Sequence, residues 1–342
     1  MIPRMSETRR KLRLLWVQSG GCGGCTMSLL GAEAPDLLTT LEAAHIEILW
    51  HPSLSEQTGT EARELMDRII DGQESLDIFC LEGAVMRGPH GTGRFHMMPG
   101  TDQSVMSRVQ ALASRAAYVV AVGSCAAYGG ITAAGGNAVD ACGLAYDGTT
   151  PGGLLGAEFR AGAGLPVINI AGCPIHPGWL AETLHMIADG SFGPAALDEW
   201  ERPVLYTSHL VHHGCGRNEF YEFKASAEHL SDMGCMMENL GCKGTQARAD
   251  CNIRPWNGAG SCLEGNYPCI NCTAPGFEEP GHSFTQTPKI AGIPIGLPTD
   301  MPKAWFVALA SLSKAATPAR LRDNATADRI RTLPTDKRKR RR

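Results

Sequence analysis

Short apolar runs alternate with helix-like segments through the first half of the chain. Five runs are rich in Val, Ile and Leu and are bounded by Gly or polar residues, which is typical of strands that are buried on both faces. These runs cover residues 12–18, 45–50, 76–81, 117–122 and 166–171. We therefore predict five strands in one sheet.

Helical spacing of apolar residues marks the segments between several of these runs. Residues 61–70 and 103–115 show this spacing, and residues 179–187 follow Pro177, a residue common in the first turn of a helix. Strands that alternate with helices indicate a parallel sheet covered on both faces. The pattern predicts a doubly wound α/β domain over residues 10–190.

The pattern changes after Pro194. Residues 191–277 are rich in Cys and Gly and have little periodicity, so they cannot build a large apolar core. Bound metal clusters would hold such a segment together. Residues 278–342 form a Pro-punctuated extension with one helical stretch at 303–316 and a basic tail at 336–342. We predict a small irregular domain followed by this extension.

Composition narrows the possible functions. Charged residues make up 19% of the 342 residues and the net charge is −4, which argues against a protein built to bind nucleic acid or an anionic membrane. The chain has 13 cysteines, an odd number, and they are clustered. This usage fits metal ligation in a reducing compartment better than a secreted disulfide framework.

The N-terminal residues Arg9 and Arg10 superficially suggest a twin-arginine export signal. Only residues 12–17 form an apolar stretch before Cys22, and cleavage there would cut into a cysteine motif. We also find no window of about twenty apolar residues for a membrane anchor. We therefore expect a cytoplasmic protein without an anchor.

Four cysteines follow predicted strands. Cys22 and Cys25 form a C-x-x-C motif, which by itself also suits a thioredoxin-like redox pair or half of a zinc site. Cys125 directly follows the run at 117–122, and Cys173 directly follows the run at 166–171. Since open α/β sheets bind ligands at the carboxyl ends of their strands, we expect the four thiols to converge.

Four converging thiolates suit Zn²⁺ or a [4Fe–4S] cluster. Zinc ribbons draw their ligands from two local pairs, whereas these cysteines are spread from Cys22 to Cys173, so we favour the cluster. Alternatively, the four cysteines bind no metal and pack as small buried apolar residues. Glu82 follows the run at 76–81. Its carboxylate either lies near this cluster, where it could serve a proton path, or is an ordinary polar group at a strand end.

A second group of ligands lies between His212 and Cys272. Its members are mixed His and Cys residues, which suit zinc or iron–sulfur sites. They are His212, Cys215, Cys235, Cys242, Cys251, Cys262, Cys269 and Cys272. Eight ligands make two four-ligand sites, and three sites along one chain indicate a path for single electrons.

The order of these motifs resembles a known family. C-x-x-C, G-S-C-A-A-Y-G-G, G-C-P-I-H-P, H-x-x-C, L-G-C-K-G, W-N and P-C-I-N-C together resemble the small subunit of [NiFe] hydrogenases across about residues 14–277. The resemblance implies a flavodoxin-like first domain. It also implies an obligate large subunit whose Ni–Fe centre splits hydrogen, with no catalytic residue in this chain.

The resemblance also assigns the ligands. It implies a proximal cluster on Cys22, Cys25, Cys125 and Cys173, a distal cluster on His212, Cys215, Cys235 and Cys242, and medial ligands at Cys251, Cys269 and Cys272. Many members have a proline where a fourth medial ligand would reach, and Cys262 falls at that place. We therefore predict a four-cysteine medial site and three [4Fe–4S] clusters, and the alternative is that Cys262 is a small buried thiol in a Gly-rich loop.

The run that begins at Cys22, C-G-G-C-T-M-S-L-L, looks most like the cytoplasmic hydrogen-sensing class, whose output is a signal to a histidine kinase. A cytoplasmic uptake hydrogenase that feeds a quinone or carrier is the alternative, and a zinc-stapled scaffold is a distant one. We expect residues 278–342 to dock a partner or a second heterodimer, or to be a disordered solubilising end. Cys80 is expected to be a buried thiol, and Cys142 has no assigned role.

Overall fold

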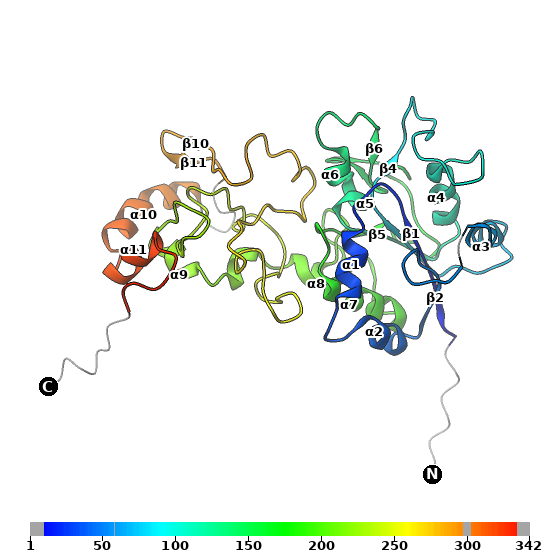
Figure 1. The fold of residues 1–342 in the computed structure, drawn as a ribbon, viewed down its shortest axis with the longest axis horizontal. Helices are drawn as coiled ribbons and strands as arrows, with labels where there is room; N and C mark the ends of the chain where they lie inside the picture. The colour runs from blue at the N-terminus through cyan, green and yellow to red at the C-terminus, as the bar shows by residue number, and fades with distance from the viewer. Residues whose placement is uncertain (1–9, 58, 297–301, 334–342) are drawn as a thin grey trace, which may run out of the picture. The chain divides into compact units, whose positions relative to one another are not determined.

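The computed structural model describes residues 10–57, 59–296 and 302–333, and the chain divides into two compact units (Figure 1). The sheet unit comprises the chain up to Leu205 together with Cys272–Glu278. The loop unit comprises Tyr206–Asn271 and the chain from Glu279 onward. The predicted boundaries after residues 190 and 277 stay a prediction.

A five-stranded parallel sheet forms the centre of the sheet unit. Its strands are β1 (Leu12–Gln18), β2 (Ile46–Trp50), β3 (Ile78–Glu82), β5 (Tyr118–Val122) and β9 (Ile168–Ile170), in the order β2-β1-β3-β5-β9. This is the flavodoxin-like order of a doubly wound fold. All five predicted strands and the predicted fold class are confirmed.

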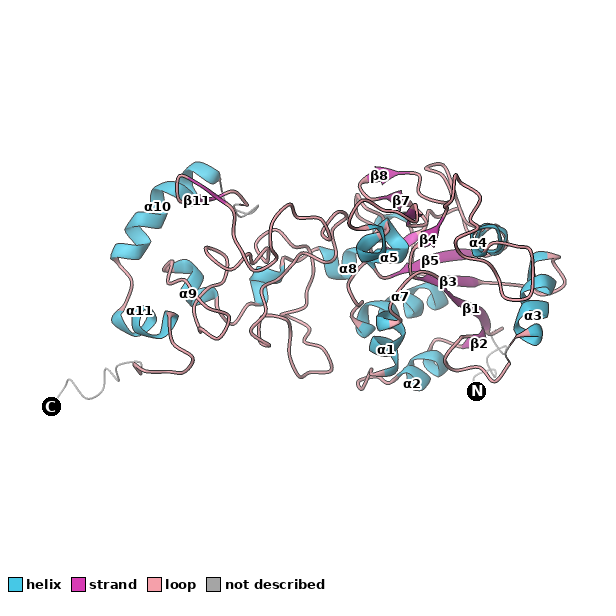
Figure 2. Cartoon of the chain, turned by 45° about the horizontal axis from the view of Figure 1, so that its top comes forward, coloured by secondary structure: helices cyan, strands magenta, loops and turns pink. Residues whose placement is uncertain are grey.

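Helices cover both faces of this sheet (Figure 2). One layer contains α1 (Gly24–Leu30), α2 (Leu37–Ala43) and α7 (Pro177–Asp189), and the other contains α3 (Thr60–Ile70) and α4 (Val105–Ala113). Because both faces are covered, the strands are continuous apolar runs. The predicted helices at 61–70, 103–115 and 179–187 are thereby confirmed.

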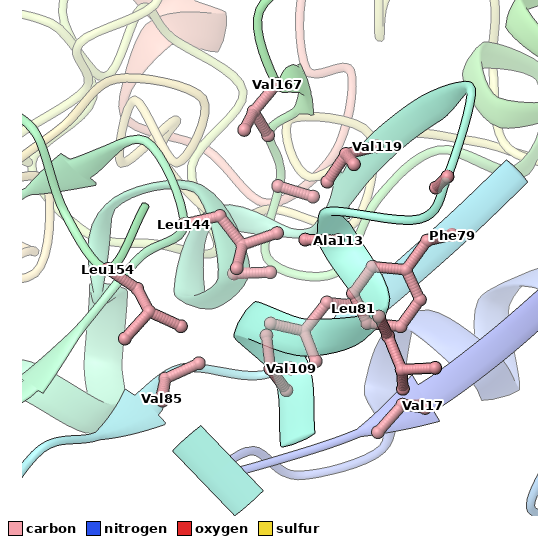
Figure 3. Packing of buried hydrophobic residues seen from close by; sticks show 14 of the residues in the cluster. Val17, Phe79, Leu81, Val85, Val109, Ala113, Val119, Leu144, Leu154 and Val167 are labelled. Atoms are coloured by element: carbon pink, nitrogen blue, oxygen red, sulfur yellow. The ribbon is translucent and has the colours of Figure 1, made fainter. Parts of the chain in front are cut away.

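The core between the sheet and α3–α4 is closely packed (Figure 3). Val17, Phe79 and Leu81 point from the strands toward Val109 and its neighbours on α4. Phe79, Leu81 and Val109 are fully buried. Burying side chains of this size stabilises a fold by about 1.5–3 kcal/mol each, so the sheet unit has a core of its own.

Short elements connect the main ones in the sheet unit. Two small antiparallel pairs lie beside the sheet. These elements are β4 (Val85–Met86) with β6 (Ala141–Cys142), β7 (Tyr146–Asp147) with β8 (Thr150–Pro151), α5 (Ser124–Tyr128), α6 (Gly130–Ala133) and a 3₁₀ turn at Pro194–Ala196. Cys80 and Cys142 are fully buried, so Cys80 is the buried thiol that the sequence predicts.

The loop unit has little regular structure. Its elements are a 3₁₀ turn at Val211–Gly214, α9 (Asn218–Glu222), β10 (Lys289–Ile290), β11 (Ile293–Pro294), α10 (Lys303–Ala315) and α11 (Ala319–Ala325), while α8 (Val204–Thr207) lies at the unit boundary. Phe306 of α10 packs with Tyr221 and Met237. The predicted helix at 303–316 is confirmed, and it is part of this unit; the basic tail lies outside the described residues.

Candidate metal centres

Four cysteines converge at the carboxyl ends of the sheet strands. Cys22 lies in the turn after β1, Cys25 in the first turn of α1, Cys125 in α5 after β5, and Cys173 after β9. Burial, followed by the nearby thiolates of Cys125 and Cys22, raises the pKa of Cys173 to about 11. Burial also raises the pKa of Cys25, with smaller contributions from Cys125 and Cys173. The structure therefore brings the four predicted proximal ligands together.

Glycines leave room for these sulfur atoms. A Cβ atom at Gly123, where φ is +89°, would lie 2.6 Å from the Cys25 Sγ atom. A Cβ atom at Gly24 would lie 3.1 Å from the Cys22 Sγ atom. Gly123 is therefore required for two reasons. An added side chain would collide with the Cys25 sulfur, and a positive φ favours glycine. The backbone is thus shaped around the thiols.

Glu82 at the end of β3 holds the turn that carries Cys25. Its Oε1 atom accepts hydrogen bonds from the amides of Cys25 at 3.0 Å and Thr26 at 3.1 Å. Its Oε2 atom accepts from Gln18 Nε2 at 3.0 Å, from the Thr26 hydroxyl and from Trp16 Nε1 at 3.3 Å. Since Gly23 offers no side-chain cap to α1, the buried Glu82 carboxylate caps this helix from a neighbouring strand.

Ser124 links two of the predicted sites. Its hydroxyl donates to the carbonyl oxygen of Cys272 and accepts from the Gly172 amide at 3.0 Å. Its own amide donates to the Gly172 carbonyl at 3.0 Å. Ser124 therefore fixes the loops of Cys125 and Cys173 against the segment that carries Cys272.

Three predicted distal ligands, Cys215, Cys235 and Cys242, surround one arginine in the loop unit. Burial, followed by the thiolates of Cys242 and Cys215, raises the pKa of Cys235 to about 12. Burial lowers the pKa of the Arg217 guanidinium, and the three thiolates oppose this effect. The Arg217 side chain is held by the carbonyl oxygens of Asp232 and Gly234, each at 2.7 Å.

The fourth predicted distal ligand, His212, lines a small cavity together with the three cysteines. Its ring centroid lies 4.3 Å from that of Tyr221. Backbone amides also point at the thiols, since the Arg217 amide donates to the Cys215 Sγ atom at 3.4 Å and the Gly244 amide donates to Cys242. Such hydrogen bonds help to set the properties of a bound cluster.

The predicted medial ligands are tied to the distal ones through the backbone. The Lys243 amide donates to the Cys269 carbonyl at 2.7 Å, and the Cys269 amide donates to the Cys242 thiol. Cys251 and Cys269 are half-buried, whereas Cys262 is exposed. Although Cys262 is exposed as a residue, neighbouring atoms partly cover its sulfur and raise the pKa of the thiol, while its own amide lowers that pKa. Among the described residues, no other cysteine contributes to the shift. Its role as a fourth medial ligand stays a prediction.

The donor sets fit clusters of iron and sulfide. In the part of the chain that the structure describes, no group of three or more His, Cys, Asp and Glu side chains is arranged to hold one metal ion. Cysteine thiolates are the usual ligands of iron–sulfur clusters, so these residues would suit such a cluster. Thiols with raised pKa values, such as those of Cys173 and Cys235, become thiolates when cationic iron offsets their repulsion.

The sequence did not identify Arg217 or Ser124 as part of these sites. Arg217 follows Cys215 by two residues, and Ser124 precedes Cys125. The sequence shows only that both residues are close to a predicted ligand. It does not show which neighbours of a ligand point toward the metal site. Only the folded chain reveals that Arg217 faces three thiols and that Ser124 bonds to Cys272.

Comparisons with known proteins cover both groups of ligands. Residues 22–187 match the family described as NADH ubiquinone oxidoreductase, 20 Kd subunit. Residues 207–285 match the family that describes the C-terminal part of the NiFe/NiFeSe hydrogenase small subunit.

Among the described residues, no helix is both long enough and apolar enough to span a membrane.

Individual relatives agree with these matches. The chain is 34% identical to the F420 non-reducing hydrogenase II small subunit of Methanosarcina mazei, over 78% of this chain and 73% of the relative. It is 31% identical to the periplasmic [NiFeSe] hydrogenase small subunit of Desulfomicrobium baculatum, over 82% and 88%.

Solved structures show the same likeness. The actinobacterial-type NiFe-hydrogenase from Ralstonia eutropha is matched with a TM-score of 0.74 and 28% identity, over 92% of this chain and 94% of that chain. The reduced Ni-Fe-Se hydrogenase from Desulfomicrobium baculatum is matched with a TM-score of 0.68 and 29% identity, over 81% and 99%. The chain therefore belongs to the small subunits of [NiFe] hydrogenases.

Proposed function

We propose that electrons from hydrogen oxidation pass through three [4Fe–4S] clusters in this small subunit. Members of the family contain iron–sulfur clusters and pair with a large subunit that holds the Ni–Fe centre, so the enzyme is active only as a complex. When bound, the clusters would supply single-electron transfer. The observation that supports the proposal most directly is the convergence of Cys22, Cys25, Cys125 and Cys173 at the sheet edge.

This chain's own residues position and shield these groups. Cys22, Cys25, Cys125 and Cys173 would hold the proximal cluster, and Glu82 fixes the Cys25 turn. His212, Cys215, Cys235 and Cys242 would hold the distal cluster around Arg217. Cys251, Cys262, Cys269 and Cys272 would hold the medial one, with Ser124 anchoring the Cys272 carbonyl.

Metal analysis of the purified heterodimer tests the relay. We expect iron and sulfide in near-equal amounts, about twelve of each in the small subunit. We also expect the large subunit to co-purify and hydrogen to reduce an added dye. Zinc as the main metal in this chain would contradict the relay and support the scaffold alternative.

The composition of the medial cluster needs its own experiment. We expect no three-iron signal in the electron paramagnetic resonance spectrum of the undamaged, oxidised protein, because a fourth thiolate completes a cubane. Cys262→Pro should produce that signal at one cluster per protein, while Cys80→Ser, a change at a buried thiol in β3, should not. A three-iron signal of equal size in the wild type and Cys262→Pro would show that Cys262 is not a ligand.

We further propose a cytoplasmic hydrogen sensor that signals to a histidine kinase, with the C-terminal extension contacting the kinase or a second heterodimer. The C-G-G-C-T-M-S-L-L run and the clustered cysteines support this role. Cell fractionation tests the compartment. Two results would support the sensor. Hydrogen turnover would be slow, and kinase output would depend on hydrogen and be lost when α11 is removed.

An uptake enzyme that passes electrons to a small carrier is the second candidate. A cavity of about 280 Å³ beside Cys235 favours it, because a carrier needs a binding place close to the last cluster. Fast hydrogen-dependent reduction of a quinone without any effect on a kinase would favour this candidate over the sensor.

A further inference from the structure

We propose that Tyr128, Tyr146 and Trp200 form a path that carries single oxidising equivalents away from the proximal cysteines, an inference that rests on the proximal cluster proposed above. The oxidant is hydrogen peroxide, which forms when oxygen is partly reduced. Tyrosine and tryptophan are the aromatic side chains that lose one electron most readily, so a chain of them in contact can carry such an equivalent. The path would spare the cysteine thiolates from oxidation.

The path begins one helical turn from a predicted ligand. Cys125 and Tyr128 both lie in α5, three residues apart. Side chains at this spacing are neighbours on a helix, with about 5–6 Å between their Cβ atoms. The Tyr128 side chain is fully buried. Tyr128 therefore connects the helix of a proximal ligand to the aromatic core of the sheet unit.

The three rings are in mutual contact. The ring centroids of Tyr128 and Tyr146 lie 5.6 Å apart, and those of Tyr146 and Trp200 lie 5.4 Å apart. The centroids of Tyr128 and Trp200 lie 6.5 Å apart. These distances are those of paired aromatic side chains. Tyr146 is buried and Trp200 is half-buried, so the rings lead from the interior of the sheet unit toward its surface.

Tyr146 has the partner that a tyrosine needs in order to lose an electron. Its hydroxyl donates a hydrogen bond to the Glu201 carboxylate. Burial, followed by Glu201 and Asp198, raises the pKa of Tyr146 to about 12, so the phenol keeps its proton at neutral pH. Burial also raises the pKa of Glu201, opposed by Arg160 and Tyr146, which makes this carboxylate a stronger base. The pair can therefore transfer the proton as the electron leaves.

Packing of the aromatic core does not require a carboxylate at this place. A backbone carbonyl would satisfy a buried phenol, and removing a carboxylate from water costs free energy. Glu201 also has a φ of +58°, a backbone conformation that non-glycine residues rarely adopt. Such strained positions cluster at functional sites. The placement of Glu201 therefore favours a proton acceptor over a packing partner.

The electrons and protons of the reaction balance. Peroxide takes up two electrons, and two protons from water, to give two molecules of water. Hydrogen oxidation supplies the first electron through the relay, and the Tyr146 phenol supplies the second. The phenol proton passes to the Glu201 carboxylate, which leaves a neutral tyrosyl radical that can exchange its oxidising equivalent with Trp200. A later electron from hydrogen and the proton on Glu201 restore the phenol.

Electron paramagnetic resonance of the heterodimer tests the path. The protein is reduced with hydrogen, transferred to argon, mixed with hydrogen peroxide and frozen at once. We expect an organic radical whose signal narrows when the protein contains ring-deuterated tyrosine. Tyr146→Phe removes only the hydroxyl and should abolish this tyrosyl signal, and it should hasten the loss of iron–sulfur absorbance in peroxide. Tyr118→Phe, the same change at the start of β5, should leave both unchanged.

Glu201→Gln gives a second change on the same path. The amide still accepts the phenol's hydrogen bond but does not take its proton, so radical formation should slow by about 100-fold or more, the contribution of a positioned base. This variant decides the question if Tyr146→Phe loses iron before peroxide is added. An unchanged radical in Tyr146→Phe or Glu201→Gln overturns the proposal, as does an iron-replete wild type that forms no radical. A protein without iron or dye reduction would instead overturn the relay itself.

Discussion

The two units support their cysteines in different ways. In the sheet unit, the cysteines follow strands whose residues, such as Leu15, Phe79 and Ile168, are fully buried without any contribution from the thiols. In the loop unit, Cys235 and Cys242 themselves pack against the small group of Tyr221, Met237 and Phe306. The first unit can fold and then bind iron, whereas the second needs iron to complete its packing.

Removal of iron should give the largest contrast between the units. We expect the full chain made without iron to keep amide protection in β1, β3 and β5. Protection within residues 210–271 should fall by roughly 100-fold or more, because bound metal contributes much of the folding free energy there. Hydrogen exchange with mass spectrometry measures both units at once. Equal protection in the two units would remove the contrast.

Gly123→Ala should remove the proximal cluster while the loop unit stays loaded. The new methyl group would lie 2.6 Å from the Cys25 Sγ atom, and the positive φ adds about 1–3 kcal/mol of strain. Gly135→Ala is the matched control, since φ is +71° there and nothing lies within 4 Å of the added atom. Iron content should drop by about a third in the first variant only. Full iron content in Gly123→Ala would contradict the assigned geometry.

Phe306→Ala should destabilise the loop unit by about 3 kcal/mol, because it leaves a cavity next to Tyr221 and Met237. Its neighbour Trp305 is 65% exposed, so Trp305→Ala should change stability by less than about 0.5 kcal/mol. Thermal loss of the iron–sulfur absorbance gives the measurement. Identical midpoints for the two variants would show that α10 does not support this unit.

Glu82→Gln should have a smaller effect, on the sheet unit alone. The amide replaces one acceptor oxygen by a donor, although Trp16, Gln18, Thr26 and the Cys25 amide all donate to this side chain. A lost buried acceptor costs about 1–3 kcal/mol. Glu47→Gln, at an exposed position of β2, is the control. Urea denaturation followed by tryptophan fluorescence should separate the two variants, and equal stabilities would count against the capping role.

The contrast between the units also explains what the sequence could predict. Continuous apolar runs locate β1 and β5, and parallel strands place Cys22 and Cys125 at one edge, so the proximal site follows from local pattern and general topology. Helix α1 was missed, since Gly23 carries no capping side chain and its cap, Glu82, comes from β3. Local sequence does not contain a cap that arrives from a distant strand.

The loop unit was less predictable for a physical reason. Its ligands were visible as residue types, but its loops have no periodicity that would fix their neighbours. The inward direction of Arg217 and the packing of Phe306 on Tyr221 depend on contacts between distant segments. The sequence therefore did not predict that α10 of the C-terminal extension packs near Cys235 and Cys242.

The exposure of the proximal cysteines bears on the order in which the enzyme is built. Cys22 and Cys173 are exposed on the sheet unit, while Cys25 is buried. We expect the large subunit to dock over this edge of the sheet, so that iron reaches these thiols after the sheet has folded and before docking closes the entrance. We expect separately produced small subunit to accept this cluster in solution, and a preformed, iron-free heterodimer to take it up far more slowly.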